Sequence, residues 1–164
     1  MATPTWVFFV ASMSGAFIGA VGASVGVWLR YRADAKNSAI KELIKEIREI
    51  SFISSEYWMV DCSTQSTQQQ QNKHKSFLLE CKILGAVENL ENTDDLTRPF
   101  FNKIDALGFH IPWANFFEDV TGGDFSVADR PMDPERAKSV QVTASKLVRD
   151  INAAHLRMRF FSSK

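Results

Sequence analysis

Hydrophobic and small residues fill the N-terminal part of the chain, and basic residues follow them at once. Residues 1–29 contain no charged side chain, whereas Arg30 and Arg32 come directly after them. As a helix, residues 5–29 would be about 37 Å long, which is more than the roughly 30 Å thickness of a hydrocarbon core. The pattern therefore predicts a single transmembrane helix, with residues 1–32 as the membrane anchor.

The position of the basic residues also predicts the orientation of this anchor. Arg30 and Arg32 follow the uncharged run, and no basic side chain precedes it. Basic residues are retained on the cytoplasmic side, so we expect the N-terminus outside and the rest of the chain inside the inner (cell) membrane. A cleaved signal peptide is the alternative interpretation, but it requires basic residues before the apolar run.

Small residues recur in the predicted span at intervals of three and four positions. They are Ser12, Gly15, Gly19, Gly22 and Gly26. This spacing places them on one stripe of a helix, where a second helix can approach closely in lipid. With one predicted span in the chain, the neighbouring helix must come from another molecule. We expect a homo-oligomer in the lipid bilayer, more readily a ring than a single crossing pair, with the two arginines at the cytoplasmic pore mouth.

Beyond the anchor, apolar residues recur at helical spacing, and no alternating strand pattern of useful length occurs. An amphipathic helix is predicted over residues 33–59, and a second helix over residues 76–90. Residues 61–75 are polar, rich in glutamine and low in complexity, so they predict a mobile loop.

Three further helices are predicted from proline, glycine and capping signals. One begins at Pro99 and stops at Gly108, and a short one begins at Pro112 and ends at the pair Gly122 and Gly123. Asp133 is predicted to cap the long last helix. The apolar seam of that helix is Ala137, Val140, Ala144, Leu147, Ile151, Ala154, Met158 and Phe161.

The predicted fold class is all-α, a single N-terminal transmembrane helix followed by a small cytoplasmic helical bundle over residues 33–164. Formal net charge is +0, so no whole-chain field points to nucleic acid. Cys62 and Cys81 lack the spacing of a disulfide framework or a zinc site, and Cys81 is expected on the apolar face of its helix. The 3 histidines also lack metal-ligand spacing, so we expect neither a metal nor a cofactor.

One short motif in the last predicted helix contains candidate catalytic residues. Arg149 and His155 are separated by five residues, and polar Asp150 follows the arginine. The pattern resembles the R-x4-6-H motif of HEPN domains, small α-helical bundles that often act as ribonucleases. In that family the arginine and histidine of two subunits meet across a dimer interface, which would activate a ribose 2′-hydroxyl and stabilise the scissile phosphate. Six positions correspond to about 240° around a helix, so the two side chains do not share a face; a solvated arginine and a half-buried histidine are the alternative.

The motif, the glycine-rich span and the small all-α domain together resemble the membrane accessory protein of type VI-B CRISPR loci. That family is an oligomeric membrane pore with a HEPN-like cytoplasmic domain, and it enhances RNA-guided antiphage defence. The resemblance implies an antiviral role, a CRISPR effector protein as partner, and a function for Arg149 and His155 that does not require RNA cleavage.

Three functions are consistent with the sequence. The first is a pore-forming or membrane-depolarising effector, and the second is a membrane-tethered HEPN-type ribonuclease. The third is a membrane-anchored sensor or adaptor that binds an anionic ligand, such as a nucleotide messenger or RNA, through its basic last helix. The basic residues of that helix are Lys138, Lys146, Arg149, Arg157 and Arg159.

Overall fold

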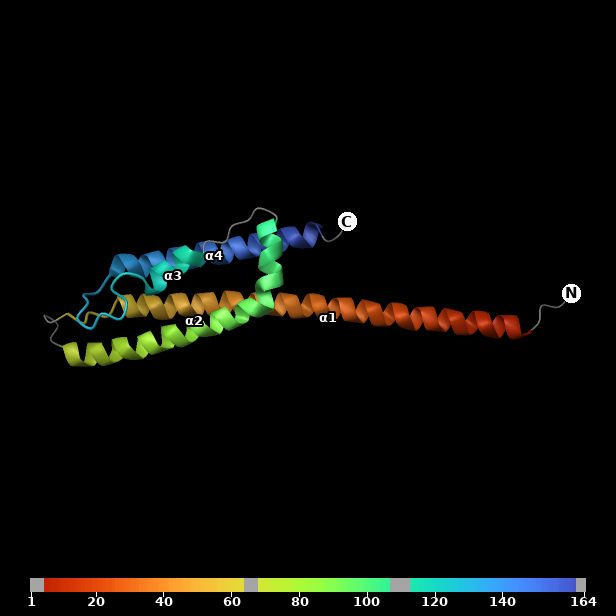
Figure 1. Ribbon diagram of the computed structural model, residues 1–164, viewed down its shortest axis with the longest axis horizontal. Helices are drawn as coiled ribbons and strands as arrows, with labels where there is room; N and C mark the ends of the chain where they lie inside the picture. The colour runs from red at the N-terminus through yellow and green to blue at the C-terminus, as the bar shows by residue number, and fades with distance from the viewer. Residues whose placement is uncertain (1–4, 64–67, 107–112, 162–164) are drawn as a thin grey trace. The chain divides into compact units, whose positions relative to one another are not determined.

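The fold was obtained as a computed structural model. It describes the backbone of residues 5–63, 68–106 and 113–161, and the side chains of residues 24–63, 68–90, 102 and 113–157. The elements in this part are four helices and no strand, which confirms the all-α fold class. They are α1 (Thr5–Trp58), α2 (Gln69–Ala106), α3 (Trp113–Thr121) and α4 (Pro134–Phe161) (Figure 1).

The chain divides into two compact units, Met1–Ala39 and Ile40–Lys164. The first unit contains the N-terminal part of α1, and the side chains of residues 24–32 are all exposed. Among the described residues, no helix is long and apolar enough to cross a membrane. The side chains of residues 1–23, which make up most of the predicted span, lie outside the described part.

The core of the second unit is formed by one buried seam on each helix. On α1 the seam is Ile40, Leu43, Ile47, Ile50 and Tyr57, at the positions that the periodicity predicts. On α4 it is Ala137, Val140, Ala144, Leu147, Ile151 and Ala154, which confirms the predicted seam through residue 154. The side chains of Met158 and Phe161 lie outside the described part.

Helix α2 differs from the prediction at both of its ends. It begins at Gln69, so the second half of the predicted 61–75 loop is helical. Glutamine and lysine are good helix formers, and the buried Leu79 and Ile83 downstream anchor the helix that they extend. Pro99 does not begin a separate helix, because α2 continues to Ala106. The helix instead bends sharply in its C-terminal part (Figure 1). A proline inside a helix removes one backbone hydrogen bond, and helices often bend where this bond is missing.

One of the two cysteines does not lie where the sequence placed it. Cys81 is exposed and Cys62 is buried, so the expectation of Cys81 on an apolar face is wrong. The reason is its position midway between Leu79 and Ile83, since two residues correspond to about 200° around a helix. Cys81 therefore faces away from the seam that these two residues form.

The predicted signals after α3 and before α4 are confirmed, whereas Pro112, the predicted start of α3, lies outside the described residues. Gly123 follows α3 with a φ of 61°, the left-handed conformation in which glycine avoids the strain of a side chain. At the start of α4, the Asp133 Oδ1 accepts a hydrogen bond of 2.9 Å from the backbone N–H of Arg136. Such a cap contributes about 1 kcal/mol to helix stability.

Candidate functional site

Arg149 and His155 occupy different surroundings on α4. The Arg149 side chain is 74% exposed, and its Nε lies 3.6 Å from Asp150 Oδ1. It projects away from the seam, where Leu147 is fully buried. His155 is half-buried next to Ala154 at the edge of the seam. The helix thus presents the arginine to the outside and holds the histidine against the core, as the helical spacing predicts.

Arg149 lies at one side of an open hollow on the outer face of α4. The hollow measures about 590 Å³, and its lining residues are Lys138, Gln141, Val142, Ser145, Lys146 and Arg149. A second hollow of about 310 Å³ shares Gln141 and Ser145 with the first and reaches Arg48 and Phe52 on α1. The two hollows adjoin at these shared residues, and we term the surface that they line together the α1–α4 groove.

Hydrogen bonds between the two helices fix the floor of this groove. The Gln141 side-chain amide donates to Ser51 O at 2.9 Å and to Ser55 Oγ at 2.8 Å. The Ser55 hydroxyl donates in turn to Ala137 O at 3.0 Å. These bonds hold α1 and α4 in register, so the side chains on the two edges of the groove keep a defined spacing.

The α1–α4 groove is cationic and partly apolar. Its cations are Arg48, Lys138, Lys146 and Arg149, and no carboxylate lines either hollow. Two large apolar side chains of the groove are exposed, Phe52 at 69% and Val142 at 60%. A surface with this composition attracts anions and leaves apolar area for a ligand to cover.

A buried arginine that the sequence did not single out lies at the C-terminal end of α1. Arg130 is 1% exposed, and its guanidinium carbon is 3.9 Å from the centroid of the Tyr57 ring. Its Nη1 donates to Val60 O at 3.2 Å, and its Nη2 donates to Tyr57 O and, at 3.4 Å, to Ser76 Oγ. Arg130 thus joins the end of α1, the first turns of α2 and the segment that precedes α4.

The surroundings of Arg130 explain why a cation is stable there. The last carbonyls of a helix carry partial negative charge, and Arg130 binds one of them, Tyr57 O, together with Val60 O just beyond the helix end. The backbone N–H of Asp133 donates to Trp58 O at 2.7 Å, which satisfies another. Near this cluster, the hydrogen bond from the Ser63 N–H, assisted by the Arg130 charge, holds the pKa of Asp61 below its usual value. The hydrogen bonds of Arg130 join three segments of the chain, so we interpret this cluster as structural.

Part of the predicted assembly stripe can be located. Ser12, Gly15, Gly19 and Gly22 lie outside the described side chains, whereas Gly26 lies within them. A Cβ at Gly26 would meet nothing within 4 Å, so this side of α1 is open. Arg30 and Arg32, the predicted pore-mouth residues, are both exposed.

Metal binding finds no support in the described part of the chain, where no group of histidine, cysteine or acidic side chains is arranged to hold an ion. Comparisons with protein-family models, curated proteins and solved structures give no match. The α1–α4 groove and the N-terminal part of α1 are therefore the two features from which a function can be inferred.

Proposed function

We propose that this chain is a single-pass membrane protein that assembles into a homo-oligomeric ring and acts as a pore-forming or membrane-depolarising effector in antiphage defence. The observation that carries the proposal is the uncharged run of residues 1–29, which ends at Arg30 and Arg32. A charge near the bilayer centre is costly, and basic residues anchor the cytoplasmic end of a span. The run fits an anchor in the inner membrane, with the C-terminal domain in the cytoplasm.

The side chains at the C-terminal end of this run, which the structure describes, favour apolar surroundings. Val27 and Leu29 are 68% and 55% exposed, and Trp28 between them is 53% exposed. A helix that is apolar on all sides requires either a protein core or a membrane around it. Lipid would cover the side chains that this part of α1 leaves exposed.

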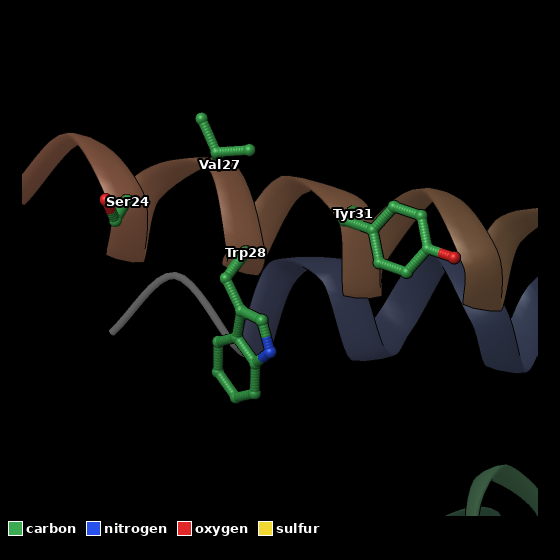
Figure 2. A pocket seen from close by; sticks show the side chains of 4 residues that line it. All are labelled: Ser24, Val27, Trp28 and Tyr31. Carbon is green, nitrogen blue, oxygen red and sulfur yellow. The ribbon is translucent and has the colours of Figure 1, made fainter.

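Aromatic and cationic residues mark the cytoplasmic boundary of the proposed span. Trp28 and Tyr31 project outward from α1 and line an open hollow of about 500 Å³ (Figure 2). The Arg32 guanidinium carbon lies 4.5 Å from the centroid of the Trp28 ring. Tryptophan, tyrosine and arginine favour the interface, where an apolar body meets lipid and a polar end meets water. We place the membrane surface at these residues.

Ring assembly is proposed from the stripe of small residues in the span. Glycines spaced by three and four positions, from Gly15 to Gly26, form a continuous line along one helix face. Such a line permits close backbone contact with a neighbouring helix over several turns. A head-to-tail arrangement of identical subunits closes into a ring when the rotation between neighbours allows it.

Isoleucine at the centre of the stripe is expected to abolish both assembly and membrane depolarisation. In Gly19→Ile and Gly22→Ile, the branched side chain holds neighbouring helices apart. Light scattering of the detergent-solubilised protein should report monomers, and a potential-sensitive dye should report a polarised membrane in expressing cells. Val25→Ile, which enlarges a residue off the stripe, is the matched control and should assemble normally. Retained rings with both glycine substitutions would contradict this mechanism.

The exposure of Arg149 favours a second candidate function, a membrane-tethered ribonuclease. An outward arginine is available to a second subunit, as catalysis by Arg149 and His155 across a dimer interface requires. In this case, Arg149→Ala and His155→Ala should each eliminate cleavage of RNA by the purified protein. A wild-type protein that leaves all tested RNAs intact would exclude this function.

The proposed partners follow from the same features. The lipid bilayer and further copies of the chain are the partners of the anchor. The resemblance to the type VI-B accessory family favours a CRISPR effector protein as a partner. The basic outer face of α4 favours an anionic ligand, either a nucleotide messenger or RNA, for a sensor or adaptor role.

A further inference from the structure

We infer that the α1–α4 groove binds a single strand of nucleic acid, with phosphates at its four cations and a base stacked on Phe52. The cations are Arg48, Lys138, Lys146 and Arg149. This inference does not depend on the membrane anchor or on ring assembly, because all of these residues lie in the Ile40–Lys164 unit. It also does not require strand cleavage.

The spacing of the cations fits an elongated ligand. Lys138, Lys146 and Arg149 lie along one outer side of α4, and all three are exposed. The rise of a helix separates the first from the last by about 17 Å along the axis. A compact anion would need these cations to converge on one point. A phosphodiester strand instead presents charges in a row, which the three side chains can follow.

The cations of the groove are available to an incoming phosphate. Within the described part of the chain, Arg48, Lys138 and Lys146 take part in no ion pair. Arg149 contacts Asp150 at 3.6 Å, but its side chain is 74% exposed. An ion pair of this kind between exposed groups contributes little, so a phosphate can replace the carboxylate. Release of counterions from the strand would favour this exchange.

Phe52 supplies the stacking surface that cations alone lack. It is 69% exposed at the α1 side of the groove, near Arg48, which lines the same hollow. Aromatic rings next to a cationic groove bind single strands without strict sequence preference, because every base has a π-face. A single strand offers bases that stack on Phe52 as well as phosphates that bind the four cations. The groove therefore favours a single strand over an anionic ligand that has no aromatic group.

Symmetric pairing of two copies along the whole groove, with no anion between them, is disfavoured by its charge. A two-fold interface places the same patch of each subunit face to face. The four cations of one copy would then meet the four of the other, and like charges across an interface cost several kcal/mol. The occupant must instead carry negative charge.

The test is titration of the purified full chain, in detergent, against fluorescein-labelled oligo(U) and oligo(dT) by fluorescence anisotropy. Probes of about 20 nucleotides and roughly 50–200 mM salt are suitable, and four phosphate contacts predict a slope of log K against log salt of about −2.8. Lys146→Gln and Arg149→Gln should each reduce the magnitude of this slope by about 0.7. Phe52→Ala should weaken binding by about tenfold without changing the slope.

Matched variants separate groove binding from other effects. Lys82→Gln removes an exposed lysine from α2, away from the groove, and should bind as wild type does. Lys146→Arg should restore the slope, and circular dichroism should show that each variant keeps its helix content. Gly19→Ile should bind as wild type does even as a monomer, which distinguishes this inference from the proposed assembly.

Three outcomes would overturn the inference. The first is no binding at the lowest salt, and the second is wild-type affinity in Lys146→Gln, Arg149→Gln and Phe52→Ala. The third is full competition by polyglutamate, if the binding of polyglutamate is weakened by the Phe52, Lys146 and Arg149 substitutions as much as the binding of the oligonucleotide is. That result would assign the groove to an acidic polypeptide.

Discussion

Arg130→Met is expected to lower the free energy of unfolding by about 3–4 kcal/mol. Methionine retains an apolar stem but removes the donors to Tyr57 O, Val60 O and Ser76 Oγ. An acceptor left buried without a partner costs about 1–3 kcal/mol. The contact of the guanidinium with the Tyr57 ring is also lost. Urea denaturation of the full chain in detergent, followed by circular dichroism, measures the effect.

Two further arginine variants make this test specific. Arg149→Met removes a side chain that is 74% exposed, so its effect should stay within about 0.5 kcal/mol. Arg130→Lys keeps the positive charge but lacks the planar fork that reaches several oxygens, so it should lie between wild type and Arg130→Met. Equal stability of Arg130→Met and Arg149→Met would show that Arg130 does not join the helices.

The second large effect is expected from Leu147→Ala, which should lower the free energy of unfolding by about 2–5 kcal/mol. Leu147 is fully buried in the α4 seam, so truncation leaves a cavity in the core. Leu156→Ala is the matched control, because the same side chain on the same helix is 54% exposed. Its effect should stay within about 0.5 kcal/mol. Equal losses in the two variants would contradict the assignment of the seam to the core.

The sequence was sufficient to predict the parts of the fold that depend on periodicity. The seams of α1 and α4 are buried where the three- and four-residue spacing places them. Asp133 caps the start of α4, and Gly123 follows α3 in the left-handed conformation. Both roles are those that aspartate and glycine commonly have at helix ends. These features are local, because the helix period and the capping chemistry are properties of adjacent residues.

Features that depend on tertiary contacts could not be predicted in this way. Pro99 is a helix-start signal locally, but α2 continues past it. Arg130 lies in a connecting segment without periodicity, so nothing in the sequence indicates its burial against the end of α1. The basic side of α4 was predicted from its composition. Arg48 and Phe52 join it only because the fold places α1 next to it.

We propose that identical subunits of this chain assemble in a membrane around an axial opening. Electron microscopy of the wild-type protein, purified from the membrane fraction in detergent, would show this assembly. We expect closed rings with an opening on the symmetry axis, formed through the stripe of Gly15, Gly19, Gly22 and Gly26. Recovery of the protein outside the membrane fraction, or particles that are only monomers or plain dimers, would contradict it.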